Sequence, residues 1–102
     1  MTRVFRSPAA ERDMEDIWLT IAVDNPSAAT RVLRAVGARI DRLADHPRLG
    51  PRRPDIHSAA RVLVEGPYLI LFETHPDTDE GPVDWVEIVR VVDGRRDLPN
   101  LF

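Results

Sequence analysis

The 14 basic residues of this sequence are all arginine, and lysine is absent. A guanidinium group is planar, permanently charged and suited to binding carboxylates and phosphates through paired hydrogen bonds. Arg61 opens one β-rich segment, and Arg90 lies in another at the same parity as its apolar neighbours. Two interpretations are open. Each arginine forms a structural ion pair with Glu65, Glu73 or an aspartate, or the arginines form a cationic site that holds a phosphate or an acidic partner segment.

Other catalytic and metal-binding groups are scarce. His75 is the only histidine close to predicted strand residues and therefore the only candidate general base. His46 precedes a proline and is expected to end a helix, where a positive charge is favourable. Cysteine is absent, and the three histidines, which include His57, do not share the spacing of a zinc site. We therefore predict no bound metal and no cofactor.

The C-terminal segment combines a basic pair with spaced apolar side chains. Arg95 and Arg96 follow an Asp-Gly pair, and Leu98, Leu101 and Phe102 come next. Either this tail packs on its own sheet, or it is an exposed apolar hook that binds a partner, since contiguous exposed apolar surface usually marks an interaction site. These five residues are the candidate target-binding segment.

Two amphipathic helices are predicted in the first half of the chain, after a short alternating segment at residues 3–6. A Ser-Pro pair begins the first helix, which runs to near residue 24. An Asn-Pro pair begins the second, whose apolar stripe continues to residue 46. Because the two helices follow each other so closely, they are expected to form a helical hairpin.

Three strands are predicted in the second half, after a loop at residues 47–60 that is rich in proline and arginine. The strands cover residues 61–65, 68–74 and 83–92, and they fit an antiparallel meander. Two amphipathic helices need a sheet to cover. The expected fold is therefore α+β, in the order β-α-α-β-β-β: an N-terminal strand and a helical hairpin packed on a small antiparallel β-sheet.

Length and charge limit the functions that remain. A chain of 102 residues is long enough for one domain, expected to span residues 1–102. A net charge of −3 argues against a sequence-specific or general nucleic-acid binder, since affinity for phosphates requires a strongly basic surface. No apolar run is long enough for a membrane span, and the first residues lack the apolar core of a signal peptide. A cytoplasmic location is therefore expected.

Four parts of the chain, in their order and spacing, carry a family resemblance. They are residues 7–18 (SPAAERDMEDIW), 43–50 (LADHPRLG), Arg61 with 68–72 (YLILF), and 88–97 (IVRVVDGRRD). Together they resemble the ParE branch of the RelE/ParE toxin superfamily. The resemblance implies a toxin of a bacterial type II toxin-antitoxin module. It also implies a ParD-like antitoxin, whose C-terminal segment wraps the toxin in a hetero-oligomer.

The superfamily that the chain resembles has two activities. RelE-like members are ribosome-dependent messenger-RNA endonucleases that use lysines, arginines and a C-terminal tyrosine, whereas ParE-like members poison DNA gyrase. This sequence has no lysine and no tyrosine after Tyr68. Two arginines alone would lack a base to activate the 2′-hydroxyl of RNA. We therefore expect a gyrase poison that is not itself an enzyme.

Two alternatives stay open. One is a ribosome-dependent endoribonuclease in which Arg61 and Arg90 hold the scissile phosphate and His75 assists. The other is a toxin-like fold that has lost toxicity and acts only in a repressor complex. Residues 76–82 also lengthen the second hairpin beyond what the family resemblance implies.

The antitoxin is expected to cover an open face or edge of the domain, either with a helix laid in a groove or with an added strand. Candidate contacts are Trp18 on the helices and Arg61, Phe72 and Arg90 on the sheet, where arginines would suit acidic residues of the antitoxin. The alternative for Trp18 is packing in the core, because it lies on the apolar stripe of its helix.

Overall fold

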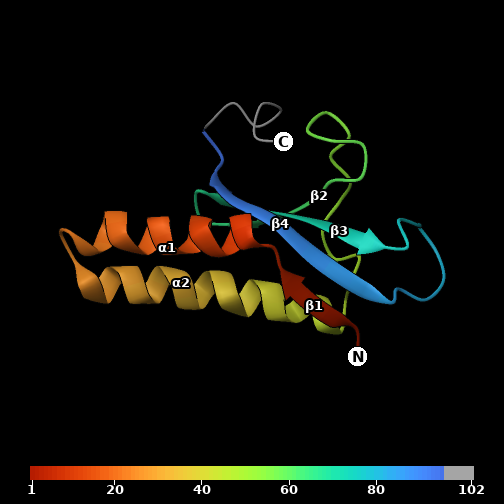
Figure 1. Cartoon of the computed structure of the whole chain (residues 1–102), viewed down its shortest axis with the longest axis horizontal. Coiled ribbons are helices and arrows are strands. Elements are labelled where there is room, and N and C mark those ends of the chain that lie inside the picture. Colours follow the sequence, from red (N-terminus) through yellow and green to blue (C-terminus); the bar gives the residue numbers. More distant parts are fainter. Residues whose placement is uncertain (96–102) are drawn as a thin grey trace.

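Two antiparallel helices pack on one face of a four-stranded sheet, as the computed structural model shows for residues 1–95 (Figure 1). The expected order β-α-α-β-β-β is confirmed. No helix among these residues is both long and apolar enough to cross a membrane. The elements are β1 (Arg3–Arg6), α1 (Pro8–Ala22), α2 (Pro26–Asp41), the short 3-10 helix η1 (Arg42–Ala44), β2 (Arg61–Glu65), β3 (Tyr68–His75) and β4 (Trp85–Asp93).

Both helices begin at the residues that the capping signals predict. The Ser7 hydroxyl accepts a hydrogen bond from Ala10 N at 3.0 Å, and the Asn25 side-chain oxygen accepts one from Ala28 N at 3.0 Å. A proline follows each cap and needs no hydrogen-bond partner there. The helix ends differ from prediction: α1 ends two residues early, at Ala22, and α2 gives way to η1 instead of continuing to His46.

The strands form one sheet in the order β1-β4-β3-β2. The antiparallel meander is confirmed, with β2 paired to β3 and β3 paired to β4. Strand β1, however, runs parallel to β4, so the sheet is mixed and not purely antiparallel. Both helices and two strands lie between β1 and β4 in sequence, and this connection is long enough for the crossover that parallel neighbours need.

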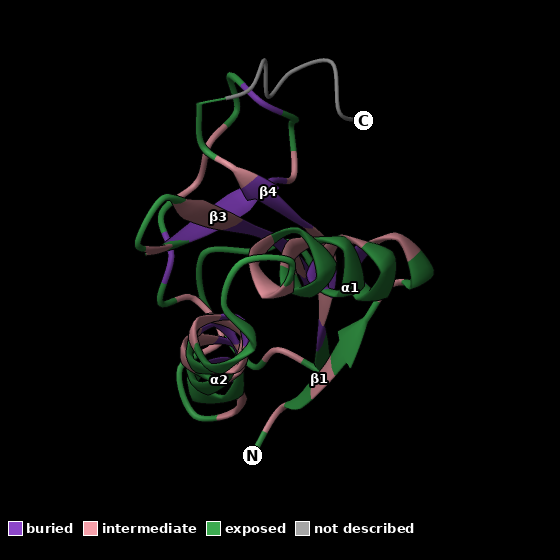
Figure 2. Ribbon diagram, turned by 90° about the vertical axis from the view of Figure 1, so that its left-hand side faces the viewer, coloured by how far each residue is buried: buried purple, intermediate pink, exposed green. Residues whose placement is uncertain are grey.

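The main core lies between the helices and the sheet, and Figure 2 shows the buried positions on β3, β4 and the inner sides of the helices. Its largest fully buried side chains include Phe72, Ile40, Leu43, Ile70 and Ile88. A second, smaller cluster contains Ile56, Ala60, Val62, Leu71 and Val92. Because neighbouring strand residues point to opposite faces, this cluster lies on the outer face of the sheet, under the loop at residues 47–60.

Gly37 lies inside α2 with little around it. A Cβ atom there would meet only a guanidinium nitrogen of Arg6, at 3.7 Å, outside its own helix. Glycine within a helix costs about 1 kcal/mol relative to alanine. Gly37→Ala is therefore expected to raise the free energy of unfolding by about 1 kcal/mol, as measured by urea denaturation. A loss of stability would contradict the open surroundings that the structure gives this position.

Candidate functional site

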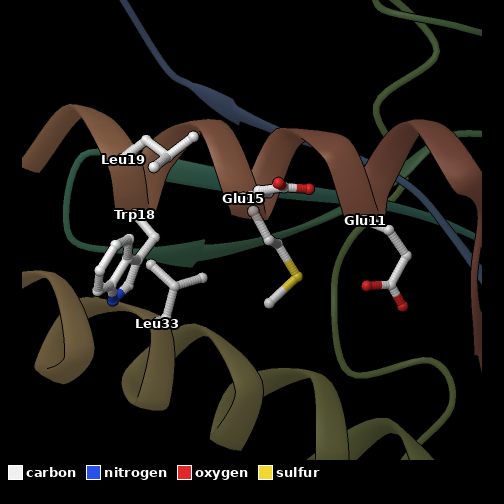
Figure 3. Close-up of a pocket in the computed structure, with 6 residues that line it drawn as sticks. Glu11, Glu15, Trp18, Leu19 and Leu33 are labelled. Atoms are coloured by element: carbon white, nitrogen blue, oxygen red, sulfur yellow. The ribbon is translucent and has the colours of Figure 1, made fainter. Parts of the chain in front are cut away.

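An exposed apolar groove runs between α1 and α2. Figure 3 shows the Trp18 ring and the Leu33 side chain meeting between the two helices, with Glu15 and Glu11 further along α1. The Trp18 side chain is 37% exposed, and its Nε1 donates a hydrogen bond to Thr30 Oγ1 of α2 at 3.4 Å. The complete lining is Glu11, Met14, Glu15, Trp18, Leu19 and Leu33.

The groove follows α1 from Glu11 in its first turn to Leu19 near the tip of the helical hairpin, which reaches beyond the ends of the strands (Figure 1). Met14 is buried at 8% exposure, whereas Leu19, five residues further along α1, is 52% exposed. The alternative that Trp18 packs in the core is therefore not what the structure shows. An apolar floor with a tryptophan and an acidic border suits a partner segment that carries apolar and basic side chains.

Arg61 is held by the part of the chain that lengthens the second hairpin. Its side chain is only 6% exposed, and its Nη2 lies 3.0 Å from Asp79 Oδ1. Nη1 donates to the Gly50 carbonyl oxygen at 3.3 Å. Burial is the main cause that lowers the pKa of Arg61. The structure therefore places this arginine in an internal ion pair.

Two further arginines hold the same stretch, residues 76–82. Arg52 donates to the carboxylates of Asp77 and Asp79, each at 2.8 Å. Arg48 donates to the carbonyl oxygens of Thr78 and Glu80. The hydrogen bond from Arg52 is the main cause that lowers the pKa of the Asp79 carboxyl. Residues 76–82 are thus fastened to β2 and to the loop before it.

Arg90 joins β4 to α1. Its Nε and Nη2 donate to the two oxygens of Asp13 at 2.7 and 2.8 Å, and Val91 N donates to the same carboxylate at 2.9 Å. The hydrogen bonds with Asp13 are the main cause that raises the pKa of Arg90. Of the two interpretations of Arg90, the structure shows the structural ion pair, and the partner is an aspartate of the first helix.

Asp13→Asn is expected to lower the free energy of unfolding by about 2 to 3 kcal/mol. The substitution leaves a half-buried guanidinium group without a charged partner, which is the costly way to break such a pair. Urea denaturation measures the change, and Asp16→Asn, at an exposed position of the same helix, is the matched control. Equal stability of the two variants would contradict a stabilising role for the pair.

His75 lies among aromatic and acidic neighbours. Its ring stacks on Trp85 with centroids 3.9 Å apart, and its Nε2 lies 3.9 Å from Glu73 Oε1 and 4.0 Å from Glu87 Oε1. The three groups of the ribonuclease alternative are therefore each associated with different carboxylates: Arg61 with Asp79, Arg90 with Asp13, and His75 with the two glutamates.

The other candidate contact residues that the structure describes do not line the groove. Phe72 is fully buried in the core, which removes it from any surface that a partner could touch. Arg95 is 82% exposed, and its Nε lies 2.9 Å from Asp93 Oδ1. The other candidate target-binding residues, Arg96, Leu98, Leu101 and Phe102, lie outside the described part of the chain. Of the four candidate antitoxin contacts, Trp18 is therefore the exposed one.

Sequence reasoning missed most of the groove. Leu33 has the spacing of the apolar stripe of the second helix, and that spacing does not separate a position at the rim of the core from one inside it. Leu19 falls beside the stripe of the first helix, and this offset is the available signal for a second apolar surface. Glu11 and Glu15, four residues apart, mark the border of that surface.

Comparisons with known proteins agree with this fold. A family model described as ParE toxin of type II toxin-antitoxin system, parDE, matches residues 4–98. Toxin ParE1 of Mycobacterium tuberculosis, in strains CDC 1551 / Oshkosh and H37Rv, is 33% identical over 98 residues, which cover 95% of this chain and 94% of the relative.

A solved structure of a chromosomal ParDE TA system from P. aeruginosa is similar in fold. It has a TM-score of 0.73 and 19% sequence identity, and the match covers 91% of this chain and 96% of that chain. The family model matches nearly the whole sequence, and the relatives from M. tuberculosis match it along their own length as well. The chain therefore belongs to the ParE toxin family of type II toxin-antitoxin systems.

Proposed function

We propose that this toxin poisons DNA gyrase by binding it, without cleaving nucleic acid itself, and that a ParD-like antitoxin neutralises it. The toxin acts in the cytoplasm, where gyrase meets DNA. The observation that carries the choice between the two superfamily activities is the pairing of the candidate nuclease residues with carboxylates.

A ribonuclease site needs free cations for the scissile phosphate. Arg61 already donates a hydrogen bond to the Asp79 carboxylate, and Arg90 donates to both carboxylate oxygens of Asp13. Glu73 and Glu87 beside His75 add negative charge where a phosphate would have to approach. These contacts favour a toxin that acts by binding its target over one that cleaves RNA.

The antitoxin is proposed to lay an apolar segment into the α1–α2 groove. Family membership supports an antitoxin partner, and the solved structure of similar fold is described as a ParDE system. The groove offers Trp18, Leu19 and Leu33 to such a segment, while Glu11 and Glu15 suit basic side chains on it. This assignment moves the proposed contact from the sheet arginines to the helices.

The C-terminal segment that begins with Arg95 and Arg96 is proposed to contact gyrase. Arg95 is well exposed, and its neighbour in the chain adds a second guanidinium group. The double variant Arg95→Ala/Arg96→Ala is the probe of this contact. It should lose gyrase inhibition while keeping antitoxin binding, since the groove residues belong to α1 and α2 and do not include these two arginines.

The decisive experiment adds the purified toxin to gyrase supercoiling and DNA-cleavage assays. Micromolar toxin should inhibit supercoiling and increase double-strand breaks, and an equimolar antitoxin should abolish both effects. A parallel assay with translating ribosomes tests the ribonuclease alternative. Cleaved messages with untouched gyrase would overturn the proposal, and inactivity in both assays together with harmless expression would instead indicate a complex-forming relic.

A further inference from the structure

A cluster of carboxylates and an imidazole lies on the outer face of the sheet, away from the helices. Glu73 and His75 are two residues apart in β3 and therefore share a face. Glu87 of β4 lies directly opposite Glu73 in the strand register. Like charges at opposite positions of paired strands destabilise a sheet. The pairing therefore needs a compensating positive charge.

The three side chains converge on a single point. Each offers one ligand atom, and these atoms all lie within 4.8 Å of one another. His75 Nε2 lies 3.9 Å from Glu73 Oε1 and 4.0 Å from Glu87 Oε1, which is too far for direct hydrogen bonds. The same nitrogen is shielded from solvent and has no hydrogen-bond partner within residues 1–95. The His75 side chain is 35% exposed as a whole, but a shielded polar atom without a partner needs an explanation, and a bound ion supplies one.

We propose that Glu73, His75 and Glu87 bind a divalent transition-metal ion, zinc in the first instance. Zinc prefers distances of about 2.0 to 2.2 Å to nitrogen and oxygen, and ligand atoms within 4.8 Å of one another can reach one shared ion after small side-chain rotations. The imidazole nitrogen selects zinc over magnesium or calcium, which take oxygen ligands, and water completes the coordination.

Neighbouring side chains fix the site in place. Trp85 stacks on the His75 ring with an interplanar angle of 6°, and Phe5 in turn contacts Trp85 edge-on at 5.8 Å. This stacking holds the imidazole so that Nε2 faces the glutamates. His57 Nδ1 lies 3.7 Å from Glu73 Oε2, the oxygen on the far side of that carboxylate. Such outer partners orient a ligating group and tune its affinity for metal.

Zinc titration of metal-free protein, followed by calorimetry and thermal unfolding, tests the site. Zinc is expected to bind with a stoichiometry of one and to raise the unfolding temperature. Glu87→Gln and His75→Gln should each weaken zinc binding about 10-fold or more. His46→Gln, at an exposed histidine outside the cluster, should leave zinc binding unchanged. Zinc binding that survives both cluster substitutions, or no binding to the unaltered protein, would overturn the proposal.

Glu87→Gln also separates a metal ligand from a merely structural glutamate. Without metal, the variant should be at least as stable as the unaltered protein, because one of two opposed charges is gone. A loss of stability in metal-free protein would mean that Glu87 already has a stabilising partner, which contradicts the proposal.

Fluorescence gives a spectroscopic check of the position. The chain has two tryptophans, so Trp18→Phe leaves Trp85 as the only one. Cobalt(II), which accepts the same ligands as zinc, should quench the fluorescence of Trp85 because the stacked His75 ring holds the ion next to it. The quenching should disappear in Trp18→Phe/Glu87→Gln, and quenching that persists there would place the ion elsewhere.

Discussion

Trp18→Ala is expected to weaken antitoxin binding by about 30-fold or more, equivalent to about 2 kcal/mol, while the toxin remains folded. Tryptophan side chains that fill the centre of an interface commonly carry much of its binding energy. Trp18 stands in the groove between the two helices with Leu33 facing it (Figure 3). Its partial exposure means that truncation removes contact surface for a partner and little of the core.

Trp85→Ala is the matched control, because Trp85 is 36% exposed, almost the same as Trp18, but lies on β4 at the outer face of the sheet. Isothermal titration calorimetry with the cognate antitoxin measures both variants, and circular dichroism checks their folding. A larger loss for Trp85→Ala than for Trp18→Ala would move the antitoxin from the helices to the sheet and refute the proposed contact.

Gly50→Ala is expected to lower the free energy of unfolding by about 3 kcal/mol or more, enough to leave much of the protein unfolded. A Cβ atom at this position would lie 2.3 Å from the Val62 carbonyl oxygen and 2.8 Å from a ring carbon of Phe72. Neither neighbour can move easily: Val62 N is tied to the Pro51 carbonyl oxygen at 3.1 Å, and the Phe72 ring is fully buried.

Gly37→Ala serves as the control for this substitution, since it adds the same methyl group where the structure has space. Urea denaturation of the two variants should therefore give changes of opposite sign. A Gly50→Ala protein with unaltered stability would show that the loop at residues 47–60 is not packed against β2 in solution. Gly50 was predicted to lie in a loop, but the close approach to β2 leaves no local signal in the sequence.

The secondary structure was predictable because its signals are local. Serine or asparagine followed by proline begins each helix, and the β-branched segments end at turn residues. The parallel pairing of β1 with β4 was not predictable in the same way. It joins residues about 80 positions apart in the chain, and four residues of strand carry no preference for one neighbour over another.

For the candidate functional surfaces, the sequence predicted types of contact but not the partner residues. An ion pair between Arg90 and a carboxylate was one of two interpretations, but Asp13 lies 77 positions away and only the docking of α1 on the sheet brings it near. The cluster at His75 was missed for a related reason. Its glutamates meet through the register of β3 and β4, so the search for regular spacing among histidines could not find it.

The loop at residues 47–60 also determines how molecules of this toxin behave toward one another. Strand β2 borders the sheet, and an uncovered border of that kind invites intermolecular β-sheet growth and precipitation. Here Pro51 already accepts the hydrogen bond of Val62 N, and Arg52 forms a bridge to Arg61. The opposite border, β1, is only four residues long and begins and ends with arginine. Both borders of the sheet therefore carry features that oppose edge-to-edge pairing with the sheet of another molecule.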